Sequence, residues 1–149
     1  MKAPPAGWPR MTASVFYDNP LAAIDWLVKA FGFELRLKVE HDGALQYSEL
    51  CYGEALLSCS NATGQEPWQS MYRSPQANGG ITQALGFHVD DVDAHHARAL
   101  AAGARIVRDL RTTDYGDDYW VDRTYGALDL EGHLWWFMQR IRTGRAREA

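Results

Sequence analysis

The chain has 149 residues, of which 46% are hydrophobic and 23% are charged, and its formal net charge is −4 at pH 7. This length accommodates one compact domain or two small modules that share a core, and the composition is ordinary for a soluble globular protein. The acidic balance argues against nucleic acid as a partner, because no excess of basic side chains is available to neutralise phosphates.

The chain has no segment that suggests a membrane or export. No apolar run approaches the roughly 20 residues that a transmembrane helix needs. Residues 1–10, MKAPPAGWPR, lack the hydrophobic core of a secretory signal, and their three prolines predict an irregular arm. We therefore expect a cytoplasmic protein in which Cys51 and Cys59, at unlike distances from a predicted hairpin turn, remain free thiols.

The first half of the chain predicts a strand, a helix and three further strands. Met11–Tyr17 combines β-branched and aromatic residues, which is typical of a strand. A polar cap at Asn19 followed by Pro20 begins a helix, whose apolar residues recur at helical spacing until Gly32 ends it. Three strands follow, with hairpin turns between them at Asp42-Gly43 and Tyr52-Gly53-Glu54: Phe33–Val39, Ala44–Tyr52 and Ala55–Cys59.

Residues 60–81 separate the two halves with a polar stretch that contains two prolines and three glycines. This composition predicts a linker or a mobile loop, and loops of this length are either functional or disordered. Trp68 within the stretch is a larger side chain than a pure spacer needs.

The second half begins with a strand over Thr82–Val89, and a helix capped by Asp90-Asp91 follows. Gly103 ends that helix, and Arg105–Leu110 predicts the next strand. A loop then leads to the closing hairpin of the domain.

The closing hairpin runs from a strand that ends at Asp129, through a tight turn at Gly132, to a strand over His133–Met138. Residues 140–149 are predicted to form a polar tail. Because Gly32 aligns with Gly103 after each helix, and Gly53 with Gly132 in each final hairpin, the chain contains an internal repeat. The repeat predicts two β-α-β-β-β modules, residues 11–59 and 82–139.

Three stretches of the chain resemble one known family. The closing hairpin contains W-x-D-R-x-Y-G and then D-x-E-G-H-x-W-x-F, and the other two stretches are FYDNPLAAIDWLVKAFGFEL and HVDDVDAHHARALAAGARIV. They resemble the vicinal oxygen chelate (VOC) superfamily, in its glyoxalase/bleomycin-resistance branch, over residues 11–139. The resemblance implies a single α+β domain in which two βαβββ modules form a curved eight-stranded mixed sheet around a cavity. It also implies a homodimer, and it implies this fold more strongly than any one reaction.

Metal-dependent members of the superfamily bind a divalent ion with four His, Glu or Gln side chains on the cavity strands. The resemblance places these four positions at Met11, Glu49, Ala84 and Trp136. Three of the four residues cannot ligate such an ion, so we expect no metal cofactor, with Zn, Ni, Mn or Fe as the alternative. A shift of two residues in the register would instead bring His88 into the cavity opposite Glu49.

Strand alternation predicts which side chains line the cavity. The predicted wall is apolar and aromatic, as small-molecule sites usually are, although the same side chains could simply fill a sheet core. It consists of Met11, Ala13 and Val15; Tyr47, Glu49 and Cys51; Thr82, Ala84, Gly86 and His88; and Leu134, Trp136 and Met138. From this wall and from two loops near the predicted mouth, the candidate ligand-binding residues are Tyr47, Glu49, His88, Trp136, Met138, Trp68 and Tyr115.

Glu49 is the candidate catalytic residue. A carboxyl group buried among apolar groups has a raised pKa and could act as a general base, or it could pair with a cationic ligand. The ordinary alternative is an exposed or paired strand glutamate. We therefore expect a metal-free protein that binds a small apolar or aromatic molecule, which could be cationic. The alternatives are a glyoxalase-type metal-dependent lyase, isomerase or dioxygenase, and a metal-free acid–base enzyme that uses Glu49.

Overall fold

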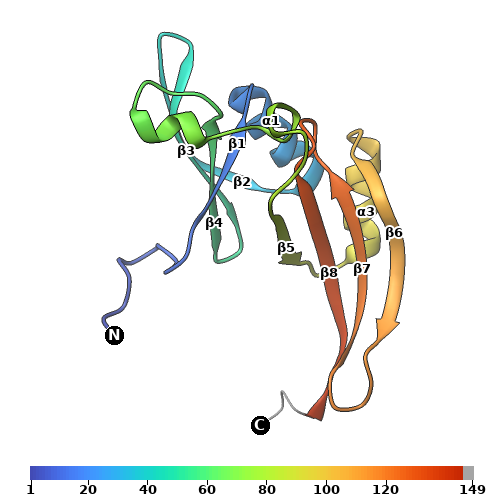
Figure 1. The fold of residues 1–149 in the computed structure, drawn as a ribbon. Helices are drawn as coiled ribbons and strands as arrows, with labels where there is room; N and C mark the ends of the chain where they lie inside the picture. Colours follow the sequence, from blue (N-terminus) through green and yellow to red (C-terminus); the bar gives the residue numbers. More distant parts are fainter. Residues whose placement is uncertain (146–149) are drawn as a thin grey trace. The chain divides into compact units, whose positions relative to one another are not determined.

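The computed structural model describes residues 1–145, and the chain divides into two compact units, of which the first spans Met1–Gly80 and the second begins at Ile81 (Figure 1). Each unit contains one strand, one helix and three further strands in that order, as the repeat predicts. The boundary between the units falls inside the polar stretch that separates the two halves of the sequence.

The first unit contains a four-stranded sheet with the strand order β1-β4-β3-β2. β1 runs parallel to β4, whereas the β2–β3 and β3–β4 pairs are antiparallel. Two short helices follow the sheet, so residues 60–81 carry more regular structure than the loop we expected. The elements are β1 (Ala13–Tyr17), α1 (Pro20–Phe31), β2 (Glu34–His41), β3 (Ala44–Tyr52), β4 (Ala55–Asn61), η1 (Pro67–Met71) and α2 (Pro75–Asn78).

The second unit contains a four-stranded sheet of the same topology, with the order β5-β8-β7-β6 and a parallel β5–β8 pair. The elements are β5 (Ala84–His88), α3 (Val92–Ala101), β6 (Arg105–Asp114), β7 (Trp120–Leu128) and β8 (Leu134–Thr143). The eight strands form two four-stranded mixed sheets, and the predicted α+β fold of two βαβββ modules is confirmed.

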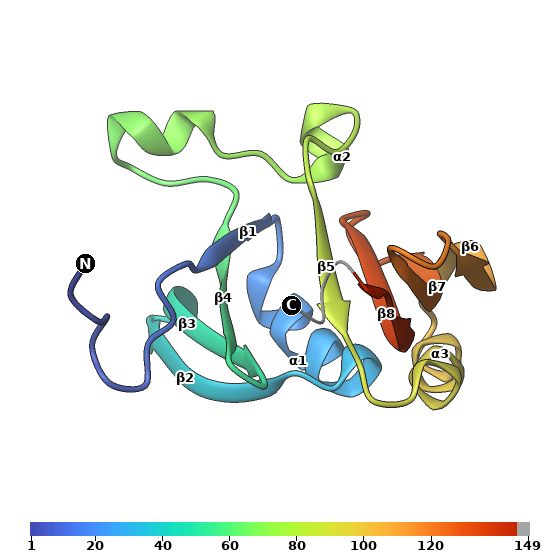
Figure 2. The ribbon, with the colours of Figure 1, turned by 90° about the horizontal axis from the view of Figure 1, so that it is seen from below.

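Helix α1 begins and ends where the sequence predicts. The Asn19 side chain caps it by accepting a hydrogen bond from the Ala22 amide at 3.1 Å, Pro20 occupies the first turn, and Gly32 adopts a left-handed φ of 78° after the last turn. One face of α1 is buried against the sheet of the first unit (Figure 2). Burial of this apolar face is the main force that holds helix and sheet together.

Helix α3 packs on the second sheet in the same way. Its buried face includes Val92, His95 and Ala99, and the His95 ring lies 4.2 Å from the ring of Phe137 on β8, centroid to centroid. His95 Nδ1 also lies 2.6 Å from the Tyr125 hydroxyl on β7. His95 therefore contributes to the core, since a polar ring is tolerated there when its nitrogen is hydrogen-bonded.

The W-x-D-R motif makes ion pairs within the second unit. Arg123 donates from Nε and Nη2 to the two carboxylate oxygens of Asp93 on α3, at 2.7 and 2.6 Å. Hydrogen bonding by Arg123 holds the pKa of Asp93 below its ordinary value. Asp122 pairs with Arg140 at 2.5 Å. These contacts join β7 to α3 and to β8.

Strand β8 extends further than the sequence predicts. It continues to Thr143 and pairs with β7 as far as Trp120, so residues 140–143 belong to the sheet although we placed them in the tail. The arginines among these residues give the segment the polar composition of a tail. Backbone hydrogen bonds to β7 nevertheless keep it in the sheet. The rest of the predicted tail beyond residue 145 lies outside the described residues.

Both cysteines carry free thiols, as expected from the hairpin spacing. Among the described residues, no helix is long and apolar enough to cross a membrane.

Candidate ligand-binding site

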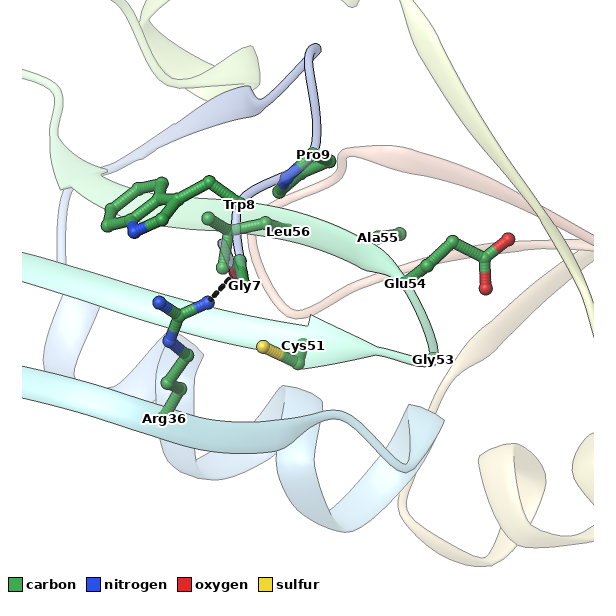
Figure 3. A pocket seen from close by; sticks show the side chains of 9 residues that line it. All are labelled: Gly7, Trp8, Pro9, Arg36, Cys51, Gly53, Glu54, Ala55 and Leu56. Atoms are coloured by element: carbon green, nitrogen blue, oxygen red, sulfur yellow. Dashed lines mark hydrogen bonds between the residues drawn. The ribbon is translucent and has the colours of Figure 1, made fainter. Parts of the chain in front are cut away.

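The first sheet has an open face, which lies away from α1 and carries Ser14 and Ser58 in register on β1 and β4. A cavity of about 170 Å³ lies on this face. A larger cavity of about 440 Å³ lies beside it, at the end of the β3–β4 hairpin (Figure 3). Trp8 and Leu56 line both cavities.

The smaller cavity is rich in side-chain hydroxyl groups. Ser58 and Ser60 on β4 lie with their Oγ atoms 3.4 Å apart, and Ser14 on β1 is paired with Ser58. This cavity therefore offers both donors and acceptors of hydrogen bonds beside an aromatic wall. Its complete lining is Trp8, Thr12, Ser14, Tyr47, Glu49, Leu56, Leu57, Ser58 and Ser60.

Glu49 is only 4% exposed, but its carboxylate is not surrounded by apolar groups. Tyr47 donates its hydroxyl hydrogen to Glu49 Oε1 at 3.1 Å, and Arg36 Nε lies 3.0 Å from Oε2. Desolvation, followed by the contact with Glu49, raises the pKa of Tyr47, so the tyrosine remains a donor at neutral pH. Glu49 therefore lies in a neutralised pair, which differs from the apolar environment that a general base would need.

Arg36 connects Glu49 to the N-terminal arm. Its Nη1 donates to the Gly7 carbonyl at 2.6 Å, and its guanidinium carbon lies 4.9 Å from the centre of the Trp8 ring. Figure 3 shows the arginine reaching from β2 to the arm at Gly7 and Trp8. A register shift in the β2–β3 pairing between Leu35 and Leu37 places Arg36 at a bulge, and bulges commonly re-aim a side chain.

The prediction for β1 is wrong by one residue. We expected Met11, Ala13 and Val15 to line the cavity, whereas Thr12 and Ser14 line it instead. Val15 is buried in the core, as is Tyr17 two residues further on. Because side chains alternate between sheet faces, this single step exchanges every residue of the strand between core and cavity.

The second sheet also has an open face, which lies away from α3. The β5–β8 pairing sets Ala84 beside Leu134, Gly86 beside Trp136 and His88 beside Met138, and all six belong to the wall we predicted. Trp135 and Phe137 between them are fully buried on the other face. The predicted alternation of these two strands is therefore confirmed.

Trp136 packs closely against its own sheet. A Cβ atom at Gly126 on β7 would lie 2.7 Å from Cζ3 of the indole, so the ring occupies the space that the glycine leaves. The guanidinium carbon of Arg108 lies 5.4 Å from the centre of the ring. The indole is thus a partly exposed platform with a cation over its ring.

Two of the candidate ligand-binding residues line neither of the described cavities. Trp68 on η1 is 53% exposed, and it is not among the residues that line either described cavity. Tyr115 lies in the second unit between β6 and β7, is 49% exposed, and contacts the Trp120 ring at 5.7 Å between centroids. Tyr47 and Glu49, by contrast, both line the smaller cavity.

The positions that would hold a metal do not fit one. Within residues 1–145, no group of three or more His, Cys, Asp or Glu side chains is arranged to hold a metal ion. Glu49 has the guanidinium of Arg36 against its carboxylate, and a cation at 3.0 Å opposes the approach of a second one. Thr12 and Ser14, which replace Met11 on the cavity wall, offer only neutral hydroxyls.

Sequence reasoning missed the contribution of the arm and of Arg36. Trp8 lies in a proline-rich stretch that predicts only irregular structure, and Arg36 is one of several alternating charges on β2. The pattern of β4 did contain a signal, because Ser58 and Ser60 alternate with the buried residues Leu57 and Cys59.

The fold agrees with comparisons to known proteins. The sequence model of the Glyoxalase/Bleomycin resistance protein/Dioxygenase superfamily matches residues 11–137. The chain therefore belongs to this superfamily. The expected βαβββ modules of that fold are those described above.

Among individual proteins, the chain is similar to TioX from Micromonospora sp. ML1, with 34% identity and a TM-score of 0.67 over 88% of this chain and 95% of TioX. The uncharacterized protein Rv0887c of Mycobacterium tuberculosis is 32% identical over 136 residues, which are 90% of this chain and 76% of that protein. TnmS3, an antibiotic binding protein from Streptomyces sp. CB03234, shares the fold with a TM-score of 0.63 at 19% identity, over 87% of this chain and 93% of TnmS3.

Proposed function

We propose that this protein binds a small planar aromatic molecule on the open face of its first sheet, without a metal and without converting it. The observation that carries the proposal is the hydroxyl-rich cavity of the first unit, in which Tyr47 and Trp8 supply aromatic walls. In the second unit, the indole of Trp136 offers a further, partly exposed aromatic surface with the Arg108 guanidinium over it. TnmS3, which shares the fold, is an antibiotic binding protein.

The charges around the site favour a neutral or acidic ligand over the cationic one that the sequence allowed. Glu49 is neutralised by Arg36, so the carboxylate does not offer an uncompensated charge to a cation. In the second unit, Arg108 lies over Trp136, so the aromatic surface of that unit also carries a positive charge that would repel a cation. The same pairing of Glu49 weakens the acid–base alternative, because proton transfer to the carboxylate would break its contacts with Arg36 and Tyr47.

Fluorescent aromatic probes of opposite charge test this proposal. We expect the anionic probe 8-anilinonaphthalene-1-sulfonate (ANS) to bind with an increase in emission, and the cationic probe proflavine to bind more weakly. Ser58→Phe fills the smaller cavity and is expected to weaken ANS binding by about tenfold or more, since a pocket must be open to bury its ligand. Fluorescence titration gives the dissociation constants.

The matched control is Ser70→Phe, which places the same side chain at an exposed serine on η1. We expect it to leave ANS affinity within about twofold of the wild type. Equal loss in both variants, or tighter binding of proflavine than of ANS, would contradict the proposed site or its charge preference.

Calorimetry tests whether the protein binds a divalent metal ion. With Ni²⁺, Zn²⁺, Mn²⁺ and Fe²⁺ titrated into protein of known metal content, we expect no stoichiometric binding tighter than about micromolar, because Arg36 already neutralises Glu49. Tight binding that disappears in Glu49→Ala would replace the present proposal with glyoxalase-type metal chemistry. Glu54→Ala, at an exposed glutamate beside the larger cavity, is the control.

A further inference from the structure

We infer that the N-terminal arm is part of the binding site: Trp8 forms a movable wall on which an aromatic ligand stacks, and Arg36, fixed by Glu49, latches that wall over the sheet. This inference rests on the proposed function and adds to it the residue that contacts the ring of the ligand. It also gives Glu49 the role of a positioning residue.

The arm is folded so that Trp8 meets the open face of the first sheet. The Trp8 amide donates to the Pro5 carbonyl at 3.0 Å, and Gly7 between them has a φ of 77°, which a residue with a side chain rarely adopts. This turn directs the chain back over the sheet. Trp8 then lines both cavities and remains 37% exposed, so part of the indole is available to a ligand.

A continuous set of polar contacts holds the arm in place. Tyr47 donates to one oxygen of Glu49, and Arg36 pairs with the other and donates to Gly7. Because the carboxylate is buried and engaged from both sides, it fixes the direction of the guanidinium. Arg36 in turn stacks on the Trp8 ring, so the position of the wall depends on a charge pair in the sheet.

The same contacts allow the wall to open. The residues around Trp8 in the arm are mostly exposed, and the turn at Gly7 is local. Segments held by few exposed contacts open at low cost in free energy, and ligand-binding lids are drawn from such segments. Arg36 itself is only partly buried, with 36% of its side chain exposed, which suits a latch better than a core ion pair.

The arrangement also indicates the class of ligand. An indole held over a cavity favours a planar ring, and the hydroxyls of Thr12, Ser58 and Ser60 across that cavity suit oxygen acceptors or hydroxyl groups on the ring. We therefore expect a planar aromatic compound that carries oxygen substituents.

Two measurements on the full chain test the inference, with ANS as the probe. In the absence of the probe, hydrogen exchange of arm peptides followed by mass spectrometry should be faster in Arg36→Ala and in Glu49→Gln than in the wild type. Glu54→Gln, which lines the larger cavity but is exposed, is the control for Glu49→Gln and should not change the exchange. With the probe, Trp8→Ala should weaken ANS binding by about tenfold, whereas Trp68→Ala should have no effect.

The outcomes separate this inference from the proposed function. If Ser58→Phe weakens ANS binding and Trp8→Ala does not, the cavity binds the probe but the arm is not its wall, and the inference is overturned. Unchanged exchange of the arm in Arg36→Ala and Glu49→Gln overturns the latch. Failure of the wild-type chain to bind ANS overturns the proposed function, and the inference with it.

Discussion

Asp129→Ala is expected to destabilise the second unit by about 3–5 kcal/mol, because one buried carboxylate organises the closing hairpin. Oδ1 accepts hydrogen bonds from the amides of Glu131 and His133, each at 3.0 Å, and Oδ2 accepts one from the Trp135 indole at 3.0 Å. Each hydrogen bond to a charged group contributes about 1.5–3 kcal/mol, and the three are not additive. Guanidinium unfolding followed by tryptophan fluorescence measures the loss.

Asp118→Ala is the matched control for Asp129→Ala. Asp118 lies in the same unit and pairs with Arg145 at 3.1 Å, but both side chains are at least 70% exposed. Such surface pairs contribute at most about 1 kcal/mol, so a small effect is expected. A loss at Asp129 no larger than at Asp118 would show that the turn glycine and the strand ladder hold the hairpin without the carboxylate.

Gly126→Ala is expected to destabilise the protein by about 1–3 kcal/mol and to displace the Trp136 platform. The new Cβ atom would lie 2.7 Å from Cζ3 and 3.0 Å from two further atoms of the indole, which is a rigid ring. Replacing glycine by alanine in an unhindered strand would instead stabilise the protein by about 0.4–1 kcal/mol. The contact with Trp136 therefore determines whether the substitution lowers or raises the free energy of unfolding. Guanidinium unfolding measures the stability, and near-ultraviolet circular dichroism reports the movement of the indole.

Gly86→Ala provides the comparison on the same open face. There the new Cβ atom would lie 3.1 Å from Met138 Cε, which is the end of a flexible side chain that can move aside. We expect a neutral or slightly stabilising effect and an unchanged aromatic signal. If Gly126→Ala is equally neutral, the indole is not confined by its sheet, and Trp136 is not a preformed aromatic surface.

Both open faces place an arginine over a tryptophan, although the two pairs arise differently. Arg36 comes from a bulge in β2 and meets Trp8 of the arm, whereas Arg108 comes from β6 and meets Trp136 within the sheet. A guanidinium stacks on an indole and keeps hydrogen-bond donors at its edge. This combination favours aromatic ligands that carry acceptors, in agreement with the hydroxyl groups of Ser58 and Ser60.

Helix ends and turns that depend on a few neighbouring residues could be predicted from the sequence. The cap at Asn19, the left-handed Gly32 and the turn around Gly132 each depend on a few neighbouring residues, and the structure has all three where predicted. The repeat of these signals predicted two β-α-β-β-β modules, and the alternation of β5 and β8 gave the correct face for Trp136. Such features follow from backbone conformation and from the two-residue period of a strand.

Features that depend on contacts between residues far apart in the chain could not be predicted from the sequence. From the sequence, either Val15 or Ser14 could face the core. In the structure Tyr17 is buried in the first unit, and Val15 is buried with it because residues two apart on a strand share a face. In the sequence, Glu49 is an isolated carboxylate on a predicted strand. In the structure, β2 places Arg36 Nε 3.0 Å from that carboxylate. Contacts with that arginine join the arm to the site, and the sequence does not predict them, because an exposed proline-rich segment has no periodicity from which its position could be predicted.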